Sequence, residues 1–415
     1  MMPLPCELAF APDQVAPVPV LPMPPMLLPL LRSTCLALLA GALCLSAPPP
    51  AQAAAATPKA SATPTRHGHA KPKQKQKKKR PALRTPAQTP GFGDPAHGRA
   101  PGDYGQRDDV AGWARDWASA QGWQADEVVA LVAQARYQKR AAQLMMPAPA
   151  GAAKDWATYR DRFVEPVRLQ AGLRFWAQHA DTLARAEAQY GVPASLIMGI
   201  LGVETNYGQI MGNYRVLDAL STLAFDFPGQ RSDRSPFFRE QLGEFLLLAR
   251  TEARDPADFK GSFAGAMGYG QFMPGSWRAF AVDFDADGHI DLIGNPSDAI
   301  GSVAHFLVKH GWQPGLMTHR VVDAPADPVQ RERLLAPDID GAWRLADLQA
   351  AGLPTDGLPD VPWAFQALEN GADAPRTHLL ASRNFWVVTR YNRSSYYALA
   401  VISLGERLAA LRNAP

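Results

Sequence analysis

The sequence contains little cysteine. Its three cysteines, Cys6, Cys35 and Cys44, all lie near the start of a chain of 415 residues. The rest of the chain can therefore form no disulfide framework and carry out no thiol chemistry. A cysteine-free body is compatible with an oxidising compartment.

Long apolar runs and familiar cofactor motifs are missing as well. Outside the N-terminal region, no segment approaches the ~18 consecutive apolar residues of a membrane-spanning helix. The sequence has no His-Glu-x-x-His motif, glycine-rich phosphate loop, nucleophile elbow or Rossmann fingerprint. We therefore expect no membrane span in the folded part and no organic cofactor.

The N-terminal region has the pattern of an export signal. Arg32 precedes a short apolar run that ends at Leu45, and Ala51-Gln-Ala53 follows it. A positive charge, a short apolar segment and an A-x-A end are typical of a secretory signal. We predict that residues 1–53 form this signal. A lipid anchor at Cys44 stays an alternative, although Leu43 fits a lipidation site poorly.

The next segment, 54–105, is rich in Ala, Pro, Thr and Lys and carries a net charge of +9, whereas residues 106–415 carry −5. Such a segment buries too little apolar surface to offset its ordering entropy, so we predict a disordered basic linker. Its run Lys71–Arg80 fits a simple charged spacer best; a tether near an anionic membrane or wall, and thus a peripheral membrane association, is the alternative. Because the chain is predicted to be exported, we expect no nucleic-acid partner.

The remaining residues, 106–415, have a mainly helical pattern. Glycines and prolines mark the ends of segments with helical periodicity. These segments predict helices over 108–119, 125–136, 170–190, 193–205, 214–226, 236–254, 296–310 and 394–412. Between about 314 and 380, short apolar pieces alternate with Pro, Asp and Gly, which predicts a small strand-containing insertion. The predicted fold class is mainly α, with this insertion making it α+β.

Glu204 stands at the end of the helix predicted over 193–205. It continues an apolar stripe formed by Ile197, Ile200 and Leu201. Burial on such a stripe raises the pKa of a carboxyl group and keeps it protonated near neutral pH. The negative helix C-terminus, which we expect Gly208 to close in a left-handed conformation, acts in the same direction. An ordinary glutamate at the edge of a stripe fits this pattern equally, so helix geometry leaves a catalytic role open.

Four blocks of sequence carry a resemblance to a known family. They are Gly202–Gly208, Lys260–Pro274, Val282–Ile290 and Arg390–Ser394, in this order. Together they resemble the lytic murein transglycosylase B family, glycoside hydrolase family 103. The likeness covers about residues 106–415. It implies a lysozyme-like helical core with an N-terminal helical subdomain, and a periplasmic enzyme.

The resemblance also implies a reaction, in which the β-1,4 bond between N-acetylmuramic acid (MurNAc) and N-acetylglucosamine (GlcNAc) is cleaved during cell-wall remodelling. Glu204 would be the single catalytic acid and base, because no other Asp or Glu stands within four residues of it. It would protonate the leaving oxygen, the muramic N-acetyl group would stabilise C1, and the C6 hydroxyl would close a 1,6-anhydro ring. We expect a monomer whose partner is the peptidoglycan glycan strand.

Two alternatives remain at this point. One is a hydrolytic muramidase, which needs a second carboxylate to position water. The other is a peptidoglycan-binding protein that keeps the fold but has lost activity.

Family positions suggest which residues contact the glycan. Glycines in the block 261–275 allow the backbone to approach a ligand closely. The residues matched to family positions are Ser262, Gln271, Tyr391, Asn392, Tyr397 and Arg234. A tight structural turn and core tyrosines would explain the same residues. Arg234 matches less well, because Asp233 stands where the family has a second arginine.

The segment that begins at Asp283 has the D-x-D-x-D-G pattern of a calcium loop, which supplies oxygen ligands at alternate positions. Position twelve is Gly294 rather than Glu, so the loop departs from the usual EF-hand. The predicted ligands of a structural, non-catalytic Ca²⁺ are Asp283, Asp285, Asp287, the His289 carbonyl and Asp298. An acidic turn without metal is the alternative.

Overall fold

The computed structural model describes residues 101–146, 154–229 and 233–414. The predicted signal and almost all of the predicted linker lie outside the described residues. The last linker residues are inside them, and there Tyr104 is 1% exposed, so the folded part includes residues that we had assigned to the linker. None of the described helices is long and apolar enough to cross a membrane.

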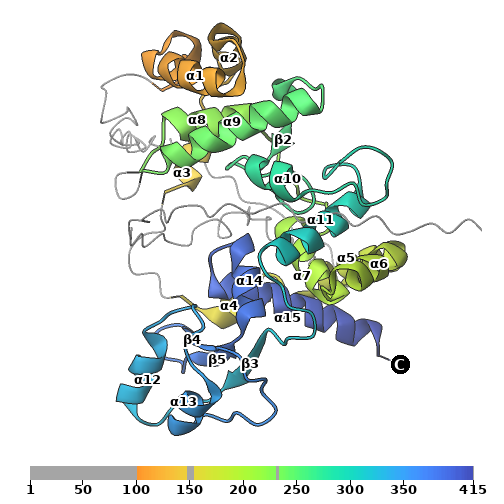
Figure 1. Ribbon diagram of the computed structural model, residues 1–415, viewed down its shortest axis with the longest axis vertical. Coiled ribbons are helices and arrows are strands. Elements are labelled where there is room, and N and C mark those ends of the chain that lie inside the picture. The colour runs from red at the N-terminus through yellow and green to blue at the C-terminus, as the bar shows by residue number, and fades with distance from the viewer. Residues whose placement is uncertain (1–100, 147–153, 230–232, 415) are drawn as a thin grey trace, which may run out of the picture. The chain divides into compact units, whose positions relative to one another are not determined.

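Helices from two stretches of the chain, 104–144 and 216–251, form a layer around α8 (Figure 1). Their bounds are η1 Tyr104–Gln106, α1 Asp108–Gln121, α2 Ala125–Val132, α3 Lys139–Leu144, α8 Val216–Phe225 and α9 Ser235–Thr251. A short ladder joins β1 (Tyr214–Arg215) to β2 (Lys260–Gly261), and η2 spans Pro256–Asp258.

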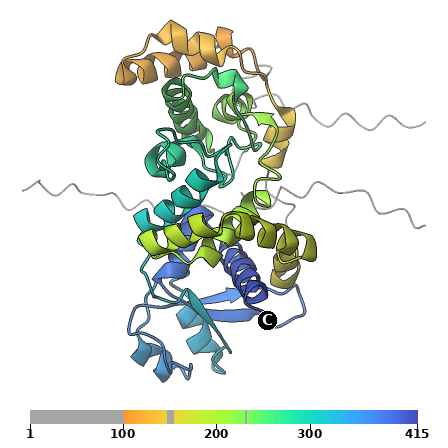
Figure 2. The same cartoon turned by 90° about the vertical axis from the view of Figure 1, so that its right-hand side faces the viewer.

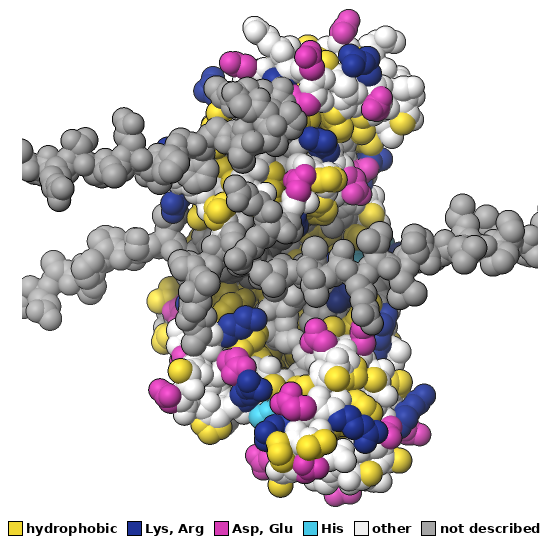
Figure 3. Space-filling model, turned by 90° about the vertical axis from the view of Figure 1, so that its left-hand side faces the viewer, with side chains coloured by type: hydrophobic (Ala, Val, Ile, Leu, Met, Phe, Trp, Pro, Cys, Tyr) yellow, Lys and Arg dark blue, Asp and Glu magenta, His cyan; other side chains and the backbone are white. Residues whose placement is uncertain are grey.

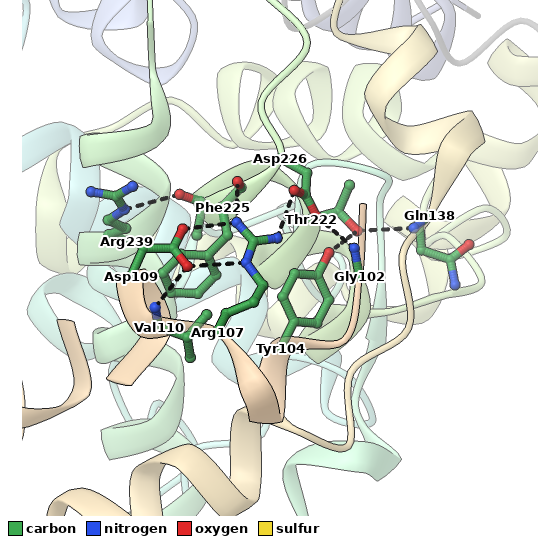
Figure 4. A network of polar contacts seen from close by, with 11 residues as sticks. Gly102, Tyr104, Arg107, Asp109, Val110, Gln138, Thr222, Phe225, Asp226 and Arg239 are labelled. Carbon is green, nitrogen blue, oxygen red and sulfur yellow. Dashed lines mark hydrogen bonds and ion pairs between the residues drawn. The ribbon is translucent and has the colours of Figure 1, made fainter. Parts of the chain in front are cut away.

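A buried polar network fixes the N-terminal segment to α8 (Figure 4). The guanidinium of Arg107 donates to Asp226 Oδ1 at 2.7 Å and to the Phe225 carbonyl at 2.8 Å. The backbone N–H of Gly102 donates to Asp226 Oδ2 at 3.1 Å. A buried ion pair of this kind needs such additional hydrogen bonds to offset the cost of desolvation.

The middle and the end of the chain build the helical core around α7, as two views show (Figures 1 and 2). The bounds are α4 Trp156–Asp161, α5 Pro166–Gln178, α6 Ala180–Tyr190, α7 Ala194–Thr205, α11 Pro296–Lys309, α14 Arg383–Tyr391 and α15 Ser395–Arg412. Helix α10 (Pro274–Phe280) packs on α9 and also contacts α11, so it connects the two layers. The single helix predicted over 170–190 is wrong, because the chain turns at His179 (φ −119°, ψ 26°) and forms α5 and α6.

The predicted strand-containing insertion is a three-stranded antiparallel sheet in the order β3 (His319–Val322), β5 (Thr377–Ala381) and β4 (Ala364–Leu368). Two short helices, α12 (Pro328–Leu335) and α13 (Leu345–Ala350), lie between its first two strands in sequence. A second hydrophobic core, which includes Trp363, Phe365 and Leu380, belongs to this part alone. Helical core, N-terminal helices and insertion together confirm the predicted fold class.

Charges are interspersed on the part of the surface that Figure 3 shows. Lys and Arg side chains alternate there with Asp and Glu over the described residues. This visible face therefore lacks the continuous basic stripe that is typical of nucleic-acid binding.

Two glycines allow α7 and α15 to touch backbone to backbone. A Cβ on Gly199 would lie 2.1 Å from the Val401 carbonyl oxygen, and a Cβ on Gly405 would lie 2.1 Å from the Ser195 carbonyl oxygen. Any side chain at either position would force the helices apart, since interiors tolerate little added volume. This contact sets the distance between the residues that the two helices carry.

We predict that Gly405→Ala lowers the free energy of unfolding by about 1–3 kcal/mol or more, because the new methyl group overpacks this contact. The matched control is Gly112→Ala in α1, where an added Cβ meets only an Arg115 nitrogen at 3.9 Å. There we expect a gain of roughly 0.5–1 kcal/mol from helix propensity. Denaturant titration measures both, and equal effects at the two positions would contradict the proposed packing.

Candidate functional site

The helix that carries Glu204 is buried on almost all sides. Every residue of α7 except Ser195 and Glu204 is buried. The prediction that only one face of this helix is apolar is therefore wrong. Helix α7 is buried on nearly all faces, so it is a central helix of the core rather than an amphipathic one. Glu204 is the charged exception, and it lies one residue before the end of the helix.

The chain leaves α7 through an unusual turn. Asn206 (φ 50°), Tyr207 (φ 60°) and Gly208 (φ 85°) are all left-handed. Gly208 adopts the predicted conformation, but the left-handed run begins two residues earlier, at non-glycine residues that rarely adopt it. The Thr205 hydroxyl holds the turn, because it donates to the Tyr269 carbonyl at 2.8 Å and accepts from the Gly208 N–H at 2.9 Å.

Among the described residues, the Glu204 carboxyl group has one hydrogen-bond partner. The hydroxyl of Tyr397, on α15, donates to Glu204 Oε1 at 2.5 Å. Burial raises the pKa of Glu204 from its usual 4.5 to about 7, against the lowering effect of the Tyr397 hydrogen bond. Among the described residues no second carboxylate contributes to this pKa shift.

Three tyrosines surround this carboxyl group. Its charge raises the pKa of Tyr159, Tyr391 and Tyr397, in each case after the larger effect of burial. Sequence reasoning singled out two of them. It missed Tyr159, which comes from the short helix α4 more than 40 positions before Glu204, with no motif around it to give a signal.

The glycine-rich block lies against Tyr391. The Tyr391 hydroxyl donates to the Gly270 carbonyl at 2.6 Å. Gln271 is left-handed (φ 50°), and its Nε2 donates to the carbonyls of Met211 and Gly268, both at 3.1 Å. Its Oε1 keeps acceptor capacity. Ser262 is 7% exposed, and its Oγ accepts from the Ala266 N–H at 3.0 Å, which leaves its O–H as a donor.

The other two glycan-site candidates lie differently. Asn392 follows Tyr391 directly, at the end of α14, and is half-buried. Arg234 lies at the start of α9 over the rings of Phe237 and Phe238, at 5.1 and 5.5 Å from the ring centroids. It thus belongs to a different helix layer from α7.

The predicted calcium ligands divide into two groups. Asp283, Asp285 and Asp287 are exposed, and one oxygen of each lies within 4.8 Å of the others. Asp298 is fully buried below them and accepts from the N–H groups of Phe284 at 2.7 Å and Asp291 at 2.8 Å. The Asp298 carboxylate therefore fixes the loop through hydrogen bonds from the loop's backbone N–H groups.

Two residues near this loop were not predicted. The side chain of Asn295 donates to Asp285 Oδ2 at 2.8 Å. Asp291 Oδ1 accepts from the N–H groups of Ile293 and Gly294, both at 2.8 Å. The result is a cluster of carboxylate oxygens on a loop with a fixed shape, as a hard divalent cation requires.

The arrangement around Glu204 favours one kind of chemistry. A carboxyl group with a pKa near 7 exchanges its proton with little cost at neutral pH, so it can act as a general acid and then as a base. Because its Oε1 accepts from Tyr397, the transferable proton belongs on Oε2. Within the described parts of the chain, no second carboxylate contributes to the pKa of Glu204.

Comparison with known proteins identifies the family of the chain. Residues 105–406 match the family model described as "Transglycosylase SLT domain". The membrane-bound lytic murein transglycosylase B of Escherichia coli strain K12 is 42% identical over 265 residues, which are 64% of this chain and 70% of that protein.

Solved structures are similar to this chain as well. The E. coli lytic transglycosylase Slt35, solved with calcium, has a TM-score of 0.63 and 37% identity, and the match covers 76% of this chain and 96% of that one. SltB3 from Pseudomonas aeruginosa, solved with NAG-anhNAM-pentapeptide, has a TM-score of 0.59 and 29% identity, and the match covers 73% of this chain and 79% of that one.

The raised pKa of Glu204 predicts how stability depends on pH. The folded state holds this proton more tightly than the unfolded chain, so the ionised group costs stability as pH rises from 4.5 to about 7. Glu204→Gln removes that cost and keeps an oxygen that accepts from Tyr397. The variant should match the wild type near pH 4 and exceed its free energy of unfolding by on the order of 1–3 kcal/mol at pH 8. Urea titrations at both pH values test this, and a difference independent of pH would contradict it.

Proposed function

The chain belongs to the transglycosylase SLT domain family and is a lytic transglycosylase that acts on peptidoglycan; on this premise we propose that Glu204 is its only catalytic acid and base. The observation that carries the proposal is a half-buried carboxyl group with a pKa of about 7 and one hydrogen-bond partner among the described residues. A hydrolytic muramidase would place a second carboxylate to hold water. Among the described residues, no second carboxylate affects the pKa of Glu204, so none is placed to hold such a water.

The reaction begins with protonated Glu204. Its Oε2 gives the proton to the oxygen that links MurNAc C1 to GlcNAc, and the C1–O bond breaks. The N-acetyl oxygen of the same MurNAc stabilises the cationic C1. The ionised Glu204 then takes the proton of the MurNAc C6 hydroxyl, whose oxygen bonds to C1 and closes the 1,6-anhydro ring. Glu204 ends protonated and no water is consumed.

Each neighbouring residue receives a role in this scheme. Tyr397 is a positioning residue that fixes Oε1 and so directs Oε2 to the substrate. Tyr391, Asn392, Ser262 and Gln271 line the site and bind sugar hydroxyl and acetamido groups through their free donors and acceptors. Arg234 would contact substrate farther from the bond that breaks.

We also propose that Asp283, Asp285, Asp287, the His289 carbonyl and Asp298 hold Ca²⁺. The exposed carboxylate cluster and the calcium in the structure of the related Slt35 support this proposal. The ion would stabilise the loop 283–298, and it would take no part in the reaction described above.

We also propose that this chain acts in the periplasm. The related E. coli enzyme is called membrane-bound. An export signal in residues 1–53 and a basic linker would place this chain in the periplasm, as a monomer with peripheral attachment to the membrane or as a lipoprotein anchored through Cys44.

For the reaction, we predict that Glu204→Gln releases at least about 100-fold less 1,6-anhydro-muropeptide from purified sacculi than the wild type. Glu406→Gln, which changes an exposed glutamate on α15, is the matched control and should act like the wild type. Mass spectrometry of the soluble products gives the result. Reducing muramic ends from the wild type would favour a hydrolase, no release would favour a binding protein, and anhydro products from Glu204→Gln would disprove the mechanism.

For the metal, calcium added to chelator-stripped protein should raise the melting temperature by several degrees. An ion at 100 times its Kd adds about 2.7 kcal/mol to the stability of the folded state. Asp285→Asn should lose most of this rise, and Asp116→Asn, at an exposed position of α1, should keep it. Differential scanning calorimetry with and without calcium measures the shift. An equal rise in both variants would rule out this loop as the site.

A further inference from the structure

The first turn of α15 carries two neighbouring tyrosines with different partners. Tyr397 donates to the Glu204 carboxyl group, as described above. Tyr396, the residue before it, contacts the insertion instead. Its hydroxyl accepts from the backbone N–H of Glu369 at 2.6 Å and donates to the Glu369 carbonyl at 3.5 Å. Glu369 directly follows β4, so these bonds fix the start of α15 to the end of that strand.

The same end of β4 also holds α4. The Trp156 N–H donates to the Glu369 carbonyl at 2.8 Å, and the Gly371 N–H donates to the Lys154 carbonyl at 2.9 Å. Trp156 is the first residue of α4 and is buried. Helix α4 therefore begins beside the end of β4, and it lies next to α15 (Figure 1).

The ring of Tyr396 joins α15 to α4. Its centroid lies 6.4 Å from the ring centroid of Trp156 and 6.0 Å from that of Tyr159, and both contacts are edge-to-face. Edge-to-face pairs have a preferred geometry, and buried rings leave little free volume around them. The Tyr396 ring therefore restricts where Tyr159 can lie.

Tyr396 can affect the candidate site only through other residues. The charge of Glu204 adds to the effect of burial in raising the pKa of both Tyr159 and Tyr397. Burial also raises the pKa of Tyr396, but Glu204 makes no contribution there. Tyr396 thus stands behind two of the tyrosines that face Glu204 and is connected to each of them, by ring contact or by the chain.

We propose that Tyr396 is a positioning residue for the reaction. It fixes α4 and the first turn of α15 to the end of β4, and so holds Tyr159 and Tyr397 against the Glu204 carboxyl group. The insertion, through the backbone of Glu369, is then a support of the site. This inference rests on the proposed function, in which Glu204 gives and takes the proton.

The first test separates kcat from KM on a glycan oligomer of defined length. Tyr396→Phe removes the hydroxyl that holds Glu369 and keeps the ring, whereas Tyr396→Leu removes the ring as well. We expect kcat to fall roughly tenfold for the phenylalanine variant and further for the leucine variant, because the reacting groups lose their alignment. KM should stay within about twofold, since the groups that bind the sugars are unchanged.

Two results would overturn the proposal. One is an unchanged kcat in Tyr396→Phe, and the other is a rise in KM without a fall in kcat. The phenylalanine variant decides the question by itself if the leucine variant does not fold, because it leaves the ring contacts with Trp156 and Tyr159 in place.

The matched control is Tyr104→Phe. The buried hydroxyl of Tyr104 donates to Thr222 Oγ1 at 3.4 Å in the N-terminal layer (Figure 4). This change therefore also removes a phenol hydroxyl and its hydrogen bond, but on a different helix layer. It should lower the melting temperature and leave kcat and KM as in the wild type. A loss of kcat equal to that of Tyr396→Phe would mean that lost stability is the cause, and would overturn the proposal.

A double variant separates this proposal from the proposed reaction. If Tyr396 acts through the groups at Glu204, its substitution has little left to disturb once that carboxyl group is replaced. The kcat of Glu204→Gln/Tyr396→Phe should therefore lie within about twofold of the low kcat of Glu204→Gln. A further tenfold loss in the double variant would show an independent effect and overturn the positioning role. Wild-type activity of Glu204→Gln alone would instead reject the proposed function, a result that needs no Tyr396 variant.

Discussion

The candidate site depends on the close contact between α7 and α15. Gly199 and Gly405 remove the side chains that would hold these helices apart, so each glycine meets a carbonyl oxygen of the other helix. The same contact brings Tyr397 of α15 to Glu204 of α7. Because every residue of α7 except Ser195 and Glu204 is buried, the carboxyl group at its last turn is largely removed from water. The pKa of Glu204 follows from this packing rather than from any neighbouring charge.

This packing explains how one carboxyl group can serve a reaction for which most glycosidases use two. A pKa of about 7 makes the protonated and ionised forms nearly equal in free energy at neutral pH. The group can therefore lose a proton in one step and regain it in the next without a large barrier from either state. In the proposed mechanism Tyr397 would contribute direction, since its hydrogen bond occupies one carboxyl oxygen and would leave the other for the substrate.

Sequence reasoning predicted the parts of the fold that local signals determine. Gly191 ends α6 and Pro193 directly precedes α7, in line with the rule that glycines and prolines mark helix ends, and the D-x-D-x-D-G pattern forms a loop that gathers its three carboxylates. It failed where tertiary packing decides the outcome. The break at His179 has no Pro or Gly to announce it, and the burial of α7 on all sides depends on helices that are distant in sequence. Tyr159 and the anchoring role of Asp298 depend on contacts of the same long-range kind.

The central claim is that Glu204 alone moves a proton between two substrate oxygens and that water takes no part. Digestion of sacculi by the wild-type chain in oxygen-18-labelled water tests this claim most directly, with mass spectrometry of the muramic ends. The account predicts anhydro ends that contain no oxygen-18 from the first product onward. Incorporation of one labelled oxygen at the muramic C1 as the bond breaks would show that water attacks there, and would contradict the account.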